Sequence, residues 1–199
     1  MADRNPVHEN PQEESLRWEE VSTEHLVQDE WIDFRRSAFR FPDGRIFQPY
    51  YSFTRRDYAV IVASDEEGRY ICVRQFRQGI REVTTEFPAG AIEKKDGASP
   101  EEAALEAAKR ELREETGYVS DHWRPLLTIP SNATISDNYA WLFAAEKCRP
   151  AAAQQLDEME LLRVCRHTGE ELDDMLSRGE FKQSVHALAW LLTKQPGKA

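Results

Sequence analysis

The chain has 199 residues, of which 40% are hydrophobic and 31% charged, enough for one sizeable hydrophobic core and a small additional layer. Its 36 acidic against 26 basic side chains give a formal charge of -10, which excludes a general electrostatic attraction to nucleic acid or an anionic membrane. The apolar runs are far shorter than the roughly 18 residues of a spanning helix, and the N-terminus is polar and acidic. We therefore expect a cytoplasmic protein with no nucleic-acid and no membrane partner.

The N-terminal quarter of the chain divides into two parts. Residues 1–14 contain two prolines and little apolar surface, which predicts a disordered tail. Residues 15–56 carry many aromatic side chains around a turn at Pro42-Asp43-Gly44, which predicts a small antiparallel β layer. Eight or more aromatic residues exceed what one small sheet face can bury in a monomer, so we expect this layer to take part in a homodimer.

The remainder, residues 57–195, predicts one mixed α/β domain. Ser99 can cap a helix whose first position is Pro100, Glu102 can complete a capping box, and the helix should end near Gly117. Six strands and two further helices follow from periodicity, composition and turn residues. Their expected ranges are Ala59–Ala63, Tyr70–Val73, Glu82–Phe87, Leu126–Ile129, Tyr139–Ala145 and Leu161–Cys165 for the strands, and Gly169–Ser177 and Gln183–Thr193 for the helices.

The C-terminal end of the first helix carries an unusual group of carboxylates. Glu111, Glu114 and Glu115 fall within roughly 100° of one another around the helix axis. They repel one another, and the negative end of the helix dipole adds a second penalty. A hard divalent cation such as Mg²⁺, which takes oxygen ligands, would relieve both. The alternative is a solvated acidic face with Arg110 and Arg113 as partners.

The segment from Arg110 to Tyr118, Arg-Glu-Leu-x-Glu-Glu-x-Gly-Tyr, resembles the second half of the Nudix box. This box is found in hydrolases that cleave nucleoside diphosphates linked to another group. Glu102 has the spacing of the first glutamate of the box, whereas eleven residues separate Gly90 from Glu102 where the family pattern has five. We therefore expect an extended helix or an enlarged loop before the box.

Two local matches are similar to the ADP-ribose pyrophosphatase branch of that family: Val73-Arg74-Gln75-Phe76-Arg77 and Glu86-Phe87-Pro88-Ala89-Gly90. The resemblance implies a Nudix-type α/β/α sandwich with a mixed sheet, preceded by the small N-terminal antiparallel β layer. It also implies that the Ala89 carbonyl joins the three glutamates Glu111, Glu114 and Glu115 in binding Mg²⁺, with Mn²⁺ as an alternative ion. Arg110 then orients these ligands by pairing with a neighbouring acid.

Substrate contacts are expected from two regions. Arg74 and Arg77 could hold phosphates, although surface ion pairing is an equal alternative. Glu86 lies in the second match. In the N-terminal layer, Trp31, Tyr50 and Tyr51 could stack on a base, as the branch does across a dimer, and their alternative is core packing.

Residues Leu156 to Val164 resemble the mobile acidic loop and following strand of the same branch, which supplies a catalytic glutamate. Glu160 is the first candidate for a general base, Glu158 the second, and Glu114 within the box the third.

The resemblance implies metal-dependent hydrolysis of the pyrophosphate of a nucleoside diphosphate sugar, ADP-ribose preferred, to a nucleoside monophosphate and a sugar phosphate. Asn132-Ala133 replaces a Pro-Gly of the branch, which leaves open another nucleotide sugar such as GDP-mannose, or a dinucleotide. A third hypothesis is a non-catalytic nucleotide-sugar-binding regulator. Its signature would be substitutions between Arg110 and Gly117, and that segment is intact.

Overall fold

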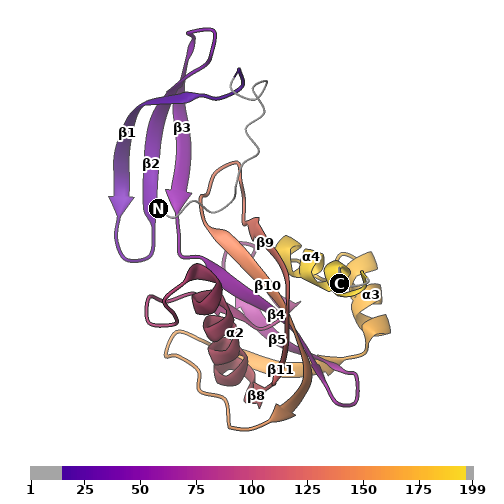
Figure 1. The fold of residues 1–199 in the computed structure, drawn as a ribbon. Coiled ribbons are helices and arrows are strands. Elements are labelled where there is room, and N and C mark those ends of the chain that lie inside the picture. The colour runs from indigo at the N-terminus through magenta and orange to yellow at the C-terminus, as the bar shows by residue number, and fades with distance from the viewer. Residues whose placement is uncertain (1–14, 196–199) are drawn as a thin grey trace. The chain divides into compact units, whose positions relative to one another are not determined.

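The computed structural model describes residues 15–195, so the predicted tail 1–14 lies outside the described residues. Two compact units account for them (Figure 1). One contains residues up to Arg55 together with Asn132–Asp137, and the other contains Arg56–Ser131 together with the residues from Asn138 onward. No helix in the range 15–195 is both long and apolar enough to cross a membrane.

The N-terminal unit is a three-stranded antiparallel sheet of β1 (Glu19–Gln28), β2 (Asp33–Arg40) and β3 (Ile46–Thr54). Five rings with centroids 4.4–6.4 Å apart gather on it: Trp18, Phe39, Phe41, Phe47 and Tyr50. Asn132–Asp137 joins this unit by backbone and side-chain hydrogen bonds, among them Phe53 N–H to the Ile135 carbonyl. Most of the sheet's surface remains exposed, because within the described residues of this unit only Ser37 and Ala38 are buried.

The second unit is built on a mixed sheet of eight strands. Its central strands β4 and β10 are parallel, and the other pairings are antiparallel. The path runs β11-β5-β4-β10-β8, with β6 on β5, β7 on β4 and β9 on β10. The bounds are β4 Tyr58–Asp65, β5 Tyr70–Arg77, β6 Glu82–Glu86, β7 Ala89–Ala91, β8 Tyr118–Val119, β9 His122–Pro130, β10 Tyr139–Pro150 and β11 Leu162–His167.

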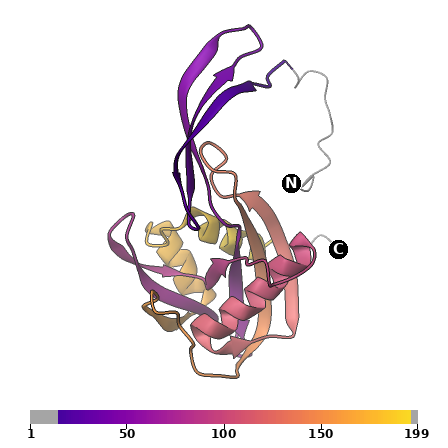
Figure 2. The same cartoon turned by 90° about the vertical axis from the view of Figure 1, so that its left-hand side faces the viewer.

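Helices cover both faces of this sheet (Figures 1 and 2). Helix α2 (Pro100–Thr116) buries Ala104, Ala108 and Leu112 against one face, where Ile61 is fully enclosed. Helices α3 (Gly169–Ser177) and α4 (Ser184–Thr193) pack on the other face, chiefly through Leu172 and Trp190. Burial on both faces explains why β4 reads as a continuous apolar run. The predicted α/β/α sandwich with a mixed sheet is confirmed.

The local details of the first helix agree with the prediction except at one residue. Ser99 accepts a hydrogen bond from Glu102 N–H, and Gly117 ends the helix with a φ of 76°. The Glu102 carboxylate, however, accepts from Ala98 N–H rather than from Ser99 N–H, so the predicted reciprocal capping box is wrong. The residues between Gly90 and Glu102 lengthen the loop, because the helix begins only at Pro100.

Further differences concern strands: β5 continues to Arg77 beyond the predicted end at Val73, and β9 begins at His122 rather than Leu126. β10 continues to Pro150, beyond the predicted end at Ala145, and β11 begins at Leu162 rather than Leu161. The short strands β7 and β8 were not expected from the sequence. Two or three residues are too few for a periodic pattern, and only their neighbours in the sheet define them as strands.

Candidate active site

Two buried carboxylates mark the C-terminal half of α2, where it faces β7. Glu111 is 7% and Glu115 3% exposed, and Glu115 accepts a hydrogen bond of 3.0 Å from Ala89 N–H. A Cβ atom built on Gly90 would lie only 2.0 Å from the Glu111 carboxyl carbon. A side chain at this position of β7 would therefore displace the Glu111 carboxylate from its present place.

Burial sets the electrostatics of this pair. It raises the pKa of Glu111 to about 7, and the neighbouring Glu114 and Glu160 add to the shift against the opposing effect of Arg110. Burial likewise raises the pKa of Glu115 well above its usual value, and Glu111 and Glu160 contribute. The positive charges of Arg110 near Glu111 and of Arg77 near Glu115 therefore do not outweigh the cost of burying the ionised carboxylates.

The donors at this site suit a hard divalent cation chemically, since all are carboxylate or carbonyl oxygens. Nevertheless, within residues 15–195 no three His, Cys, Asp or Glu side chains converge closely enough to hold an ion as they stand. Glu111 and Glu114 are turned towards Arg110, and Glu115 is turned towards Ala89 N–H. An ion would bind here by drawing these carboxylates from their present partners.

Arg110 connects the carboxylates to the enlarged loop. Its Nη1 donates to Glu111 at 2.7 Å and to Glu114 at 3.1 Å, while Nε and Nη2 donate to Asp96 at 3.2 Å. Nη2 also donates to the Ala91 carbonyl at 2.9 Å. Asp96 was missed by the sequence analysis because it belongs to no motif; its position before the box in the inserted loop is the only available signal.

Arg77 and Glu86 form a second, enclosed ion pair. Glu86 is fully buried, and Arg77 Nε donates to its Oε1 at 2.9 Å. Burial alone would raise the pKa of Glu86, but hydrogen bonds from Arg77 and Thr84 outweigh it and hold the pKa below its usual value. Gln183, the residue before α4, donates to the same carboxylate at 3.4 Å. Glu86 therefore contacts Arg77 here, and its direct contact with a substrate stays a prediction.

Arg74 differs from Arg77 in its surroundings. It is exposed and lies directly opposite Arg163 in the pairing of β5 with β11. Like charges in that arrangement repel. Its predicted contact with a phosphate stays a prediction.

The acidic loop, residues 151–161, is attached to the end of α2. Gly117 accepts hydrogen bonds from Ala151 and Ala152, and Gln154 Nε2 donates to the Glu115 carbonyl at 2.6 Å. At the far end of the loop, Glu160 lies near enough to Glu111 and Glu115 to raise the pKa of both. Glu160 and Glu158 are both exposed, but only Glu160 is among the groups that raise the pKa values of Glu111 and Glu115.

The three aromatic candidates belong to the N-terminal unit. Trp31 is 67% exposed, Tyr51 is stacked on Phe34 with a centroid distance of 5.8 Å, and Tyr50 lies in the ring cluster and donates its hydroxyl to the Thr134 carbonyl. Their contact with a substrate stays a prediction.

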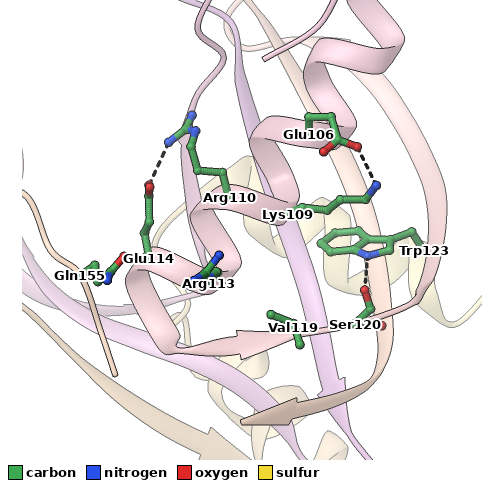
Figure 3. Close-up of a pocket in the computed structure, with 9 residues that line it drawn as sticks. All are labelled: Glu106, Lys109, Arg110, Arg113, Glu114, Val119, Ser120, Trp123 and Gln155. Carbon is green, nitrogen blue, oxygen red and sulfur yellow. Dashed lines mark hydrogen bonds and ion pairs between the residues drawn. The ribbon is translucent and has the colours of Figure 1, made fainter. Parts of the chain in front are cut away.

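A pocket of about 390 Å³ lies beside the carboxylates, between α2, β8 and the start of β9 (Figure 3). Two ion pairs lie among its lining residues, Lys109 with Glu106 at 2.6 Å and Arg110 with Glu114 at 3.1 Å. Trp123 donates its indole N–H to the Ser120 carbonyl. Glu114 of the α2 carboxylates and its partner Arg110 line this pocket, but Glu111 and Glu115 do not.

Comparisons with known proteins identify relatives of this chain and a solved structure with a similar fold. The chain is 28% identical over 185 residues to an ADP-ribose pyrophosphatase of Bacillus subtilis, covering 91% of this chain and 96% of the relative. It is 37% identical over 109 residues to an ADP-sugar pyrophosphatase of Mus musculus, covering 49% of this chain and 47% of the relative. The crystal structure of an ADP compounds hydrolase superposes with a TM-score of 0.76 at 22% identity, covering 90% of this chain and 94% of that chain, which shows the shared fold.

A family model described as the NUDIX domain matches residues 54–191, well over half of the chain, and includes the acidic end of α2, β7 and the acidic loop. Nudix hydrolases generally need divalent cations, in keeping with the all-oxygen donors found here. The protein belongs to the Nudix family and is a Nudix pyrophosphohydrolase of the ADP-ribose pyrophosphatase-like kind.

Proposed function

We propose that this protein hydrolyses the pyrophosphate bond of a nucleoside diphosphate sugar, preferably ADP-ribose, to a nucleoside monophosphate and a sugar phosphate, with Mg²⁺ as its ion. The observation that carries the proposal is the pair of buried carboxylates Glu111 and Glu115 against β7, with Glu160 within electrostatic reach. The names of the two relatives, ADP-ribose pyrophosphatase and ADP-sugar pyrophosphatase, support the substrate class.

The roles follow from the chemistry of the side chains. Glu111, Glu114, Glu115 and the Ala89 carbonyl would hold the divalent cation, which when bound neutralises phosphate charge and activates water. Arg110 would keep the carboxylates in place, because it also holds Asp96 and the Ala91 carbonyl. Arg77, whose Nε and Nη2 donate to the buried Glu86, would donate to a phosphate oxygen through Nη1.

Glu160 is the proposed general base. Its charge is felt by both buried carboxylates, so it belongs to the same electrostatic environment as the ion they would hold. Glu114, which is already turned towards Arg110, is the candidate if Glu160 is dispensable. The N-terminal layer, residues 15–56, is proposed to contribute the dimer contact and, through Trp31, Tyr50 and Tyr51, part of the substrate site. A cytoplasmic location remains an expectation from the sequence.

The test is a substrate panel. ADP-ribose, another ADP-sugar, GDP-mannose and a dinucleotide are incubated with the protein in Mg²⁺, in Mn²⁺ and in EDTA, and the released monophosphate is quantified. We expect the highest kcat/KM for ADP-ribose and no turnover in EDTA. A preference for GDP-mannose or the dinucleotide would mean that the proposed substrate is wrong, whereas the proposed reaction, pyrophosphate hydrolysis, is right. Binding of nucleotide sugars without hydrolysis would identify a regulator and overturn the proposal.

A further inference from the structure

The edge strand β11 stops short of the end of its partner. It pairs with β5 from His167 opposite Tyr70 to Leu162 opposite Gln75. β5 continues for two more residues, Phe76 and Arg77, which pair with β6 on one side. Among the described residues, these two have no strand partner on the β11 side. The backbone edge of β5 is therefore open next to the acidic loop.

Apolar side chains lie uncovered on both sides of that gap. Leu161, the residue before β11, is 89% exposed. Phe76 on β5 is 50% exposed, and Val83, directly opposite it on β6, is 57% exposed. An exposed leucine beside an exposed Phe-Val pair is costly in water and gains by burial.

Continuing the observed register by two residues aligns these groups. Leu161 then comes opposite Phe76, and Glu160 comes opposite Arg77, because no register shift interrupts either pairing of β5. Paired residues of neighbouring strands share a face, so Leu161 would pack across Phe76 towards Val83.

Side chains alternate between the two faces of a strand, and this alternation determines the face on which Glu160 would lie. On β5, Ile71 faces the core beneath α2 and Cys72 faces the core beneath α3 and α4. Arg77 lies an even number of residues from Ile71, so it shares the α2 face, as does Glu160 opposite it. That face carries Glu111 and Glu115.

We propose that Leu161 is a positioning residue for the reaction: it packs on Phe76 when residues 160–161 extend β11 along β5, and this extension sets Glu160 opposite Arg77 on the face of the box carboxylates. The task given to Glu160 rests on the proposed function; the strand extension does not. In the structure described, Glu160 is held in a turn by its N–H to the Asp157 carbonyl and by its carboxylate to Asp157 N–H. When residues 160–161 extend β11, these two hydrogen bonds are replaced by backbone hydrogen bonds to β5.

The first experiment tests the register without any turnover. A Leu161→Cys/Phe76→Cys protein and a Met159→Cys/Phe76→Cys protein are treated with diamide, and the bonds are mapped by mass spectrometry. Cα atoms of directly paired residues are about 4.5–5.5 Å apart, within the range of a disulfide. We expect the 161–76 bond to form about tenfold faster than the 159–76 bond. Equal rates, or no 161–76 bond, would overturn the extension.

The second experiment tests the role in catalysis. Leu161→Ala should lower kcat about tenfold, the factor for about 1.4 kcal/mol, with KM within threefold, because the substrate still binds but Glu160 is less often in place. Phe76→Ala should act the same way, and the double variant should be little worse than either single one. The exposure of Leu161 means that its truncation leaves the fold intact, and an unchanged melting temperature verifies this.

Met159→Ala is the matched control. Met159 is 95% exposed in the same loop, but the extended register places it opposite Gln78, beyond the end of β5. It should leave kcat and KM unchanged, and an effect equal to that of Leu161→Ala would overturn the positioning role. If the wild-type protein hydrolyses no nucleotide sugar, the proposed function fails while the disulfide experiment still decides the register.

Discussion

Gly90 is the residue whose missing side chain leaves room for the Glu111 carboxylate beside β7. A methyl group there would meet the carboxyl atoms of Glu111 at 2.0–2.3 Å and would push that side chain away from its place beside Arg110. We predict that Gly90→Ala lowers kcat/KM at least about a hundredfold through the displaced carboxylate. Steady-state kinetics at saturating Mg²⁺ measures this.

The matched control for that substitution is Gly79→Ala. Gly79 lies in the turn between β5 and β6, a methyl group added to it would meet no atom within 4 Å, and its φ is not in the left-handed region. The activity of this variant should equal that of the wild type. A comparable loss of activity in both variants would mean that the effect of Gly90→Ala does not come from contact of the new methyl group with Glu111.

Glu160 and Glu158 are two acids of one loop with different surroundings. Only Glu160 is among the residues that raise the pKa values of Glu111 and Glu115. We predict that Glu160→Gln lowers kcat by about 10² to 10⁴, as expected for loss of a general base, with KM within a few-fold. Glu158→Gln should retain most of the wild-type kcat. If both retain full turnover, the base lies within the box, with Glu114 the first residue to test.

His186 provides a prediction of pH dependence. It is fully buried, its Nδ1 accepts a hydrogen bond from Phe87 N–H, and burial lowers its pKa from 6.5 to about 4. Below pH 6.5 the unfolded chain binds a proton that the folded protein binds only near pH 4. The free energy of unfolding therefore falls as the pH drops through this window, by about 3 kcal/mol at most.

The wild-type curve alone will not reveal this effect. The raised pKa of Glu111 acts oppositely, since its contribution to stability is present below its ordinary pKa and is lost as the pH rises towards about 7. The comparison is therefore with His186→Gln, whose amide oxygen can still accept from Phe87 N–H. In urea unfolding of metal-free protein, the wild type should lose about 2–3 kcal/mol relative to this variant between pH 7 and 4.5. Parallel curves would contradict it.

At the scale of elements, α2 positions the site because its two ends are fixed by different groups. Ser99 Oγ accepts the Glu102 N–H at the start, and at the end the acidic loop bonds the Gly117 carbonyl. We predict that Ser99→Ala lowers the free energy of unfolding by about 1 kcal/mol, whereas Ser99→Asp, which can cap equally well, leaves it nearly unchanged. Urea unfolding measures both. KM should be unaffected, since the cap lies at the other end of the helix from the carboxylates.

The elements that could be predicted are those with long, regular patterns. Ser99-Pro100 and Gly117 define the bounds of α2, and the apolar run of β4 identifies a strand buried on both faces. The short β7 and β8 could not be predicted, because their pairing with β4 and β10 depends on residues distant in the chain. The bond of Glu102 to Ala98 instead of Ser99 shows that spacing alone does not determine which N–H a side chain accepts from.

The candidate site shows the same limit. The sequence places Glu111, Glu114 and Glu115 on one side of a helix, but burial depends on β7 and the acidic loop, which a helical wheel does not include. Glu86 looks like a substrate ligand within its motif, yet the fold encloses it with Arg77 and Thr84. Asp96 holds Arg110 from a loop in which no pattern singles it out.

At the scale of the whole molecule, the N-terminal unit stands out for the apolar surface it leaves in water. Most of its large apolar side chains are about 40–70% exposed: Leu16, Trp18, Val21, Leu26, Val27, Trp31, Ile46, Phe47 and Tyr51. Its described residues bury only Ser37 and Ala38, both of them small. A sheet of three strands with this composition gains stability mainly by covering such side chains against another surface.

A second copy of the chain is the partner we predict, because the resemblance implies a dimer through this layer and a self-complementary interface supplies the missing apolar surface. Light scattering at micromolar concentration should give twice the chain mass of 23.0 kDa. Val27→Glu combined with Trp31→Glu, which places charges on two of the exposed apolar positions, should give a monomer with an unchanged melting transition of the Nudix domain. Met159→Glu, a charge at an even more exposed apolar residue of the other unit, should leave the dimer intact. A wild-type mass of one chain, or a dimer that persists in the double variant, would contradict the prediction and leave the exposed sheet to a different partner.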